Sequence, residues 1–263
     1  MNASEAVRTD VLDQVLTITL DRPKANAIDA ATSRALYAAF ARLRNDEQLR
    51  VAIITGAGQR FFSAGWDLKA AAAGERADSD WGPGGFAGLT EFLDIGKPVI
   101  AAVNGLAIGG GFELALAADL LVAAEHAQFA LPEATLGLVA DSGGLLRLPT
   151  RLPRAIAREL LLTGRRMDSA EAARWGLAND VVAADELMPS ARRLAEAICA
   201  CAPLAVTATL EVLRETEGQT IGQGLQTMRA DGLTCYPRVA SSADAQEGPL
   251  AFVERRPPRW QGS

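Results

Sequence analysis

Residues 97–123 read KPVIAAVNGLAIGGGFELALAADLLVA, and this stretch decides the fold. Val99–Val103 is a short apolar run, which is typical of a strand buried on both faces of a sheet. Three glycines at residues 109–111 lead into a predicted helix over residues 112–118, and residues 120–123 form another apolar run. A helix between two such strands indicates that the strands pair in parallel, so the sequence predicts an α/β core.

The flanking segments extend this pattern. Residues 14–20 (QVLTITL) alternate between apolar and polar side chains as a strand does, and residues 51–55 (VAIIT) form another buried run. Between these two strands, residues 30–43 have the apolar spacing of a helix. From about residue 152 the pattern becomes helical, and no Ser- or Gly-rich linker divides the chain into separate domains.

The composition bounds the class of protein. A chain of 263 residues with 49% hydrophobic and 22% charged residues can bury the core of one large globular domain. The net charge of −6 argues against a broad nucleic-acid surface, because such a surface needs a basic patch. The first ten residues, MNASEAVRTD, lack the apolar region of a secretory signal, and no uninterrupted apolar run is long enough to span a membrane. We therefore expect a cytoplasmic protein that binds neither nucleic acid nor a membrane.

The chain contains a single histidine, His126. A metal site built from several histidines is therefore impossible, and one candidate remains for a Ser-His or Cys-His nucleophile pair. Because His126 lies beside polar residues in VAAEHAQF, we interpret it as a turn or surface residue. The motifs GxGxxG after a strand and GxxxxGK(S/T) do not occur, so we predict neither a dinucleotide site nor a nucleotide-phosphate loop. We also predict no metal site.

Two acidic residues in apolar surroundings are the candidates for proton transfer. Glu113 lies between Phe112 and Leu114, and Glu133 follows in FALPEATLGL. A carboxylate is poorly solvated in such a position, and two that converge can form a general acid/base pair. The alternative for Glu133 is an ordinary helix start after a proline. A third acid, Asp141, follows eight residues later, and its alternative is a structural role as the N-cap of the run SGGLLRL.

Two glycine-containing turns offer backbone N–H groups. The triple glycine stands at a helix N-terminus, where N–H groups lack an internal partner and a ligand oxygen can use them. Residues 60–69 (RFFSAGWDLK) put a Ser-Ala-Gly turn just beyond the strand at 51–55, at the sheet edge where α/β folds bind ligands. Donors from both turns together would form an oxyanion hole. A tight structural turn and an ordinary strand–loop crossing remain the alternatives.

Several ordered motifs together resemble the crotonase, or enoyl-CoA hydratase/isomerase, superfamily. They are DRPKANAID (21–29), FSAGWDL (62–68), KPVIAAVNGLAIGGGFELALAAD (97–119), FALPEATLGL (129–138), GGLLRLP (143–149) and EGPLAFVERRPP (247–258). The resemblance implies an α/β fold of the ClpP/crotonase type, with a spiral of repeated ββα turns and the active site in residues 1–200. It also implies a C-terminal helical region, residues 201–263, through which subunits assemble into a homotrimer or a hexamer of two trimers.

The same resemblance implies a lyase that reversibly adds water to a 2-enoyl-CoA thioester. Two backbone N–H groups would polarise the thioester carbonyl, and they match Trp66 and Gly110. Glu113 would act as the base on water and Glu133 would deliver a proton to the α-carbon. No cofactor is implied, since coenzyme A is part of the substrate.

The resemblance also implies substrate contacts from residues outside the glutamate pair. Lys24 would meet the coenzyme A phosphates, whereas the adenine end would be lined and covered by Ala64, Asp67, Leu68 and Phe252. Simple hydratases tend to carry a small residue where this chain has Asp141. Because the chain looks closest to a branch whose substrate bears a trimethylammonium group, we hypothesise that Asp141 holds that cation. An aromatic wall would come from Trp66, Trp81 or Phe86.

Four other functions remain open from the sequence. A general short-chain enoyl-CoA hydratase would use the same machinery. A dienoyl-CoA isomerase would have an acid at the position of Asp141, although that branch usually has aspartate where this chain has Glu113. A non-catalytic acyl-CoA binder or an RNA binder is disfavoured by the two glutamates and by the acidic balance.

Overall fold

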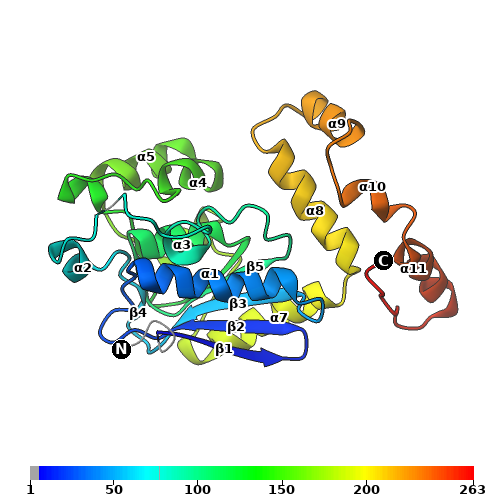
Figure 1. Ribbon diagram of the computed structural model, residues 1–263, viewed down its shortest axis with the longest axis horizontal. Coiled ribbons are helices and arrows are strands. Elements are labelled where there is room, and N and C mark those ends of the chain that lie inside the picture. Colours follow the sequence, from blue (N-terminus) through cyan, green and yellow to red (C-terminus); the bar gives the residue numbers. More distant parts are fainter. Residues whose placement is uncertain (1–5, 77) are drawn as a thin grey trace.

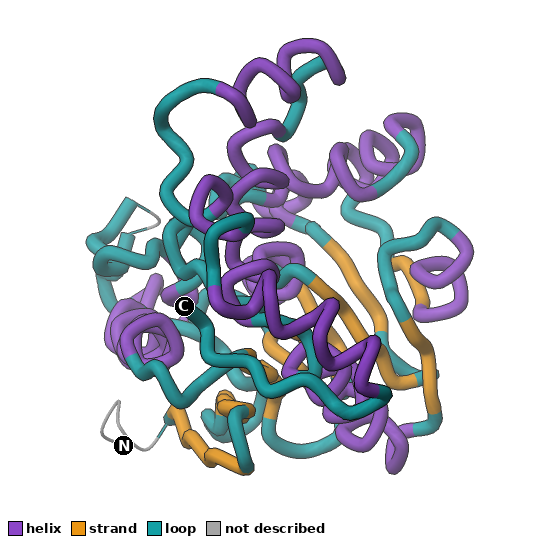
Figure 2. Tube along the Cα trace, turned by 90° about the vertical axis from the view of Figure 1, so that its right-hand side faces the viewer, coloured by secondary structure: helices purple, strands orange, loops and turns teal. Residues whose placement is uncertain are grey.

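The computed structural model describes residues 6–76 and 78–263, and its larger sheet forms the centre of the molecule (Figure 1). The strand order is β1-β2-β3-β5-β7-β10. The strands are β1 (Val7–Leu12), β2 (Val15–Leu20), β3 (Val51–Gly56), β5 (Val99–Val103), β7 (Leu120–Ala124) and β10 (Asp180–Val182). β1 pairs antiparallel with β2, and the other neighbours pair in parallel, which confirms the predicted parallel α/β core. Figure 2 shows the long strands running side by side.

A smaller sheet runs beside the larger one in the order β4-β6-β8-β9. Its strands are β4 (Phe61–Ser63), β6 (Leu106–Ile108), β8 (Gln128–Ala130) and β9 (Met167–Asp168). Each of β3, β5 and β7 is thus followed directly by a short strand of the smaller sheet. This alternation is the repeated ββα turn that the resemblance implies, and β4, β6 and β8 pair in parallel.

Helices connect the turns and cover the sheets. They are α1 (Ala30–Asn45), α2 (Leu68–Ala72), α3 (Gly110–Ala117), α4 (Gly144–Arg151), α5 (Arg154–Thr163), α6 (Ser169–Arg174) and α7 (Leu187–Cys199), with 3₁₀ turns η2 (Phe86–Gly88), η3 (Glu133–Leu136) and η4 (Ala184–Glu186). α1 begins where the Asp29 side chain accepts from the Thr32 N–H, and it buries Leu36 and Phe40. Complete burial of such a side chain contributes about 1.5–3 kcal/mol.

The C-terminal arm, residues 203–263, projects from the core (Figure 1). It contains α8 (Pro203–Thr216), α9 (Ile221–Arg229), α10 (Tyr236–Val239) and α11 (Ala243–Glu254). The buried carboxylate of Glu211 on α8 accepts from the N–H groups of Thr234, Cys235 and Tyr236, and so ties α10 to α8. The Trp260 indole N–H donates to the Ala200 carbonyl at 2.7 Å, which fastens the chain end to the core.

Among the described residues, no single helix has the length and apolar character to span a membrane, although residues 184–199 and 203–216 meet that test together as a pair bent by 103°.

Candidate active site

Three turns of the smaller sheet meet at one edge. β6 is paired in parallel with β4 on one side and with β8 on the other, so the chain leaves all three strands at the same edge. These exits are residues 64–66 after β4, residues 109–110 after β6 and residues 131–133 after β8. Sequence positions far apart are thereby brought to one place.

A cavity of about 270 Å³ opens beside these turns. Five predicted site residues line it: Trp66, Gly110, Glu113, Glu133 and Asp141. The other residues that line it are Trp81, Phe86, Gly137, Leu138, Val139 and Ser142. The structure therefore brings the two candidate acids and both candidate backbone donors to the same cavity.

Glu113 stands in the first turn of α3 and is 3% exposed. Its Oε1 accepts from the Gly144 N–H at 2.8 Å. Burial raises the pKa of Glu113 to about 8, against the lowering effect of the Gly144 hydrogen bond. The charges of Glu133 and Asp141 raise this pKa further, whereas Arg147 lowers it.

Glu133 begins η3 directly after Pro132. Its Oε2 is enclosed and has no hydrogen-bond partner among residues 6–76 and 78–263. Burial also raises the pKa of Glu133, and the charge of Asp141 adds to that effect. An enclosed carboxyl oxygen without a partner is costly, which makes Glu133 a candidate to meet a group that enters the cavity.

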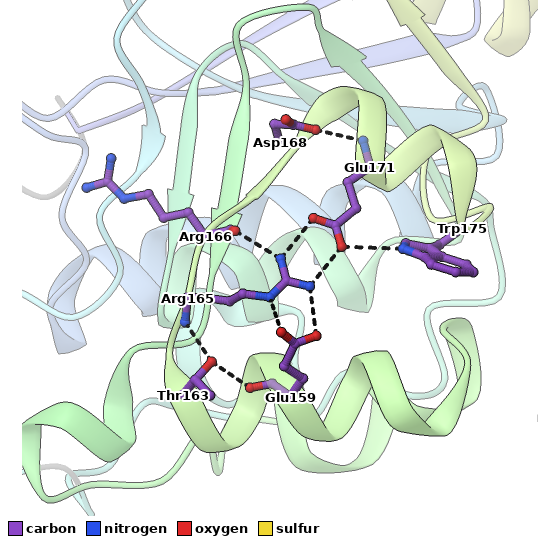
Figure 3. A network of polar contacts seen from close by, with 7 residues as sticks. All are labelled: Glu159, Thr163, Arg165, Arg166, Asp168, Glu171 and Trp175. Atoms are coloured by element: carbon purple, nitrogen blue, oxygen red, sulfur yellow. Dashed lines mark hydrogen bonds and ion pairs between the residues drawn. The ribbon is translucent and has the colours of Figure 1, made fainter.

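A charge network centred on Arg165 joins α5 to α6 (Figure 3). The Arg165 guanidinium makes ion pairs with Glu159 of α5 at 3.0 Å and with Glu171 of α6 at 2.8 Å. The preceding residue, Gly164, packs so closely on Pro132 that an added Cβ would lie 2.9 Å from the Pro132 Cα. The charges of the network are thus paired within the fold, and the residue beside Arg165 packs on the turn that carries Glu133.

The residue before one backbone donor packs against the residue that carries the other. A Cβ added to Gly65 would lie 2.7 Å from the Gly110 nitrogen. Ile28 and Trp66 form an isolated parallel β-bridge. In this bridge the Ile28 N–H donates to the Gly65 carbonyl and the Asp67 N–H donates to the Ile28 carbonyl, so the Trp66 N–H takes no part in it. Gly110 is the first residue of α3, where the N–H lacks a carbonyl partner within the helix.

One wall of the cavity is aromatic. The rings of Trp66 and Trp81 meet edge to face at 6.4 Å, and those of Trp81 and Phe86 at 5.1 Å. The Trp66 indole N–H donates to Glu75 Oε1 at 2.8 Å, which fixes the first ring. Phe86 in turn packs on Gly110, where an added Cβ would lie 2.3 Å from the ring.

The remaining predicted binding residues are dispersed. Ala64, Asp67 and Leu68 flank Trp66, but the Asp67 carboxylate is paired with Arg22 at 2.7 Å. Lys24 lines a separate recess of about 260 Å³. Phe252 is 85% exposed on α11, which Figure 1 places on the other side of the molecule from α2. Within one chain, Phe252 is therefore not brought to the cavity.

Other sequence expectations are resolved directly. His126 is exposed in the turn between β7 and β8, as predicted, and its Nε2 lies 2.9 Å from the Gln59 carbonyl oxygen. Asp141 does not cap α4, since the N-cap is Gly143 and Asp141 is exposed at the cavity rim. Sequence reasoning missed Gly144, Arg147 and Glu75. Gly144 and Arg147 lie within the motif GGLLRLP, where a glycine pair before a helix was the available signal.

Comparison with known proteins agrees with this geometry. The family model described as enoyl-CoA hydratase/isomerase matches residues 11–263, and the chain belongs to this family. Proteins named carnitinyl-CoA dehydratase from Proteus mirabilis (strain HI4320) and Salmonella arizonae are 61% and 60% identical to it, each over 98% of this chain and 99% of the relative.

Solved structures of the same family superpose on nearly the whole chain. An enoyl-CoA hydratase from Mycobacterium tuberculosis H37Rv has a TM-score of 0.90 at 46% identity, covering 98% of this chain and 99% of its own. A carnitinyl-CoA hydratase from Mycobacterium avium has a TM-score of 0.76 at 43% identity, with the same coverage. The predicted crotonase fold and the prediction of an enoyl-CoA hydratase-type enzyme are confirmed, and an acyl-CoA thioester fits as its substrate.

Proposed function

We propose that the protein reversibly hydrates crotonobetainyl-CoA to L-carnitinyl-CoA. The observation that carries the chemistry is the convergence of Glu113 and Glu133 on one cavity beside the Gly110 N–H. The relatives named carnitinyl-CoA dehydratase, at 60–61% identity, support the acyl group.

In the proposed reaction, the N–H groups of Trp66 and Gly110 bind the thioester oxygen. Glu113 removes a proton from water as the water oxygen bonds to the β-carbon. The electron pair of the double bond moves toward the carbonyl, and the two donors stabilise the enolate-like charge, each by about 2.7–4 kcal/mol in comparable sites. Glu133 then gives its proton to the α-carbon, and dehydration follows the same steps in reverse. Water addition changes no oxidation state, so the proposal includes no cofactor.

The proposed pair works with one proton between its two carboxyl groups. An ionised Glu133 is among the causes that raise the pKa of Glu113 to about 8, so this value describes loss of the second proton from the pair. Just below that pH the pair keeps one proton, which Glu113 holds as the acid for dehydration and which lies on Glu133 when hydration begins. Its loss leaves no acid to protonate the α-carbon or the departing hydroxyl group.

We therefore expect kcat/KM to fall as pH rises through about 8. It should also fall at low pH, where both carboxyl groups are protonated and no base remains. Initial rates followed by the absorbance of the conjugated thioester measure this profile. A rate that stays level across the alkaline limb would contradict the shared-proton scheme.

The trimethylammonium group is proposed to bind between Asp141 and the aromatic wall. A cation is attracted to the faces of Trp and Phe rings, and a carboxylate supplies the matching charge. Asp141 is exposed, so its pairing is worth only ~1 kcal/mol. Asp141→Asn should therefore raise KM for crotonobetainyl-CoA by about five-fold and leave KM for crotonyl-CoA nearly unchanged. An equal rise in KM for both substrates would show that Asp141 does not bind the trimethylammonium group.

A panel of acyl-CoA substrates tests the proposed function as a whole. The highest kcat/KM is expected for crotonobetainyl-CoA. A preference for crotonyl-CoA would favour a general short-chain hydratase. Movement of a double bond without uptake of water would identify a dienoyl-CoA isomerase, and binding without turnover would identify an acyl-CoA binder.

The proposed assembly is a homotrimer or a hexamer of two trimers. Its support is the apolar surface of the arm, where Ile221 is 83%, Phe252 85% and Val253 78% exposed. In such an assembly Phe252 would cover the adenine end of a neighbour's substrate. Mass measurement in solution separates the two states. The cytoplasmic location stays a prediction from the sequence.

A further inference from the structure

Arg147 is a partly buried cation behind the cavity that the proposed mechanism does not use. It lies on α4, and its Nη2 donates to the Thr90 carbonyl oxygen at 2.7 Å. Burial lowers the pKa of Arg147, but a guanidinium keeps its proton in proteins. Because burying a charge is costly, its position calls for a physical reason.

One side of the guanidinium packs on the turn that holds Glu113. A Cβ added to Gly143 would lie 1.9 Å from Arg147 Nη1, so the guanidinium rests directly on that glycine. Gly143 has a φ of 106° and caps α4, where its carbonyl oxygen accepts the ordinary helical hydrogen bond from the backbone N–H of residue 147 at 2.8 Å. The next residue, Gly144, donates to Glu113 Oε1 at 2.8 Å. Arg147 therefore supports the backbone that supplies this hydrogen bond.

The other side of the guanidinium reaches the segment that carries Phe86. The Thr90 carbonyl accepts from Arg147, and the Thr90 hydroxyl donates to the Phe86 carbonyl at 2.8 Å. Phe86 packs on Gly110, whose N–H is one of the proposed oxyanion donors. One side chain thus joins the backbone on both sides of the cavity.

The charges that face Arg147 come from several elements. Glu113 faces it from α3, Glu91 from the loop after η2, and Glu217 from the end of α8. Arg151 adds a like charge from the same helix. The positive charge of Arg147 lowers the pKa of Glu113, in opposition to burial and to the two neighbouring carboxylates.

We propose that Arg147 is a positioning residue that braces the two backbone segments on either side of Glu113. This inference rests on the proposed role of Glu113. It adds a residue that touches neither the substrate nor the reacting atoms, but sets the geometry and charge around the acid that does.

The test compares Arg147→Met with Arg151→Met. Arg151 lies one turn further along α4, donates to the Ala118 carbonyl and faces Asp119, so it is a matched, partly buried arginine outside the cavity. Arg147→Met should lower kcat about ten-fold with KM within about two-fold, because small displacements of catalytic groups are expensive. It should also move the alkaline limb of the pH profile upward by about half a unit, since the lowering effect on Glu113 is lost. Arg151→Met should leave the limb unchanged.

A conservative variant separates charge from geometry. Arg147→Lys keeps the charge but lacks the planar fork that contacts Thr90 and Gly143 together. Compared with Arg147→Met, the Arg147→Lys variant should have the alkaline limb of its pH profile at the wild-type position, but it should regain only part of the lost kcat.

Several results would overturn the inference. The inference would be wrong if Arg147→Met kept the wild-type kcat and pH profile. It would also be wrong if Arg147→Met and Arg151→Met lost the same amount of kcat and neither shifted the alkaline limb of the pH profile. If Arg147→Met does not fold, Arg147→Lys decides by its kcat, and failure of both to fold would assign Arg147 to stability alone. Full activity in Glu113→Gln would instead refute the proposed function. An inactive Glu113→Gln beside a normal Arg147→Met would refute this inference only.

Discussion

Replacing either glutamate by glutamine is expected to lower kcat by about 10²–10⁴, the usual contribution of a positioned acid or base. Glutamine at position 113 can still accept from the Gly144 N–H through its Oε1, so the turn should keep its geometry. KM should change little, because neither carboxyl group is proposed to bind the coenzyme A portion. Glu47→Gln, at an exposed position after α1, is the control.

The two substitutions should differ in hydrogen exchange at the α-carbon. A saturated acyl-CoA has no leaving hydroxyl group, so exchange of its α-proton with deuterated water requires the α-carbon base and the oxyanion donors alone. Glu113→Gln should therefore retain exchange, whereas Glu133→Gln should lose it. Loss of exchange in Glu113→Gln with retention in Glu133→Gln would reverse the proposed roles.

The convergence of the glutamates shows what the sequence can predict and why. Glu113 and Glu133 were candidates because each stands in apolar surroundings, and that property is local. Their meeting depends on parallel pairing of β6 with β8, in which Leu106 is opposite Gln128 and Ile108 is opposite Ala130. The sequence predicts a parallel core, but the short strands of the smaller sheet carry too few residues for a periodic signal.

Other features depend on contacts that no local pattern encodes. Arg147 reaches Thr90 across 57 positions of the chain, and Trp66 reaches Glu75 from a loop with no regular spacing. The environment of Phe252 depends on how the arm packs, because α11 lies away from the cavity of its own chain. Family resemblance supplied Trp66 and Phe252 from the sequence, whereas Arg147 and Glu75 were found only in the structure.

The close packing of Gly65 on the start of α3 leads to the second large effect. Gly65 has a φ of 77°, and a Cβ there would lie 2.6 Å from the Ile108 carbonyl oxygen and 2.7 Å from the Gly110 nitrogen. Both contacts are with backbone, so Gly65→Ala must push the Trp66 turn away from the start of α3. Misplacing one donor costs about 2.7–4 kcal/mol of transition-state stabilisation. We therefore expect kcat to fall about 10²–10³-fold, with a smaller change in KM.

A matched control separates this collision from backbone strain. Gly176 has a φ of 76°, and a Cβ there would have nothing within 4 Å. Gly176→Ala should therefore bear the same left-handed strain, roughly 1 kcal/mol, without touching the cavity. Thermal unfolding should show a loss of stability in both variants, while the loss of kcat should be confined to Gly65→Ala. The carbonyl stretch of a bound thioester should also return toward its solution frequency in Gly65→Ala, because fewer donors polarise it. Equal kcat losses in the two variants would mean that strain, and not the spacing of Trp66 and Gly110, controls the reaction.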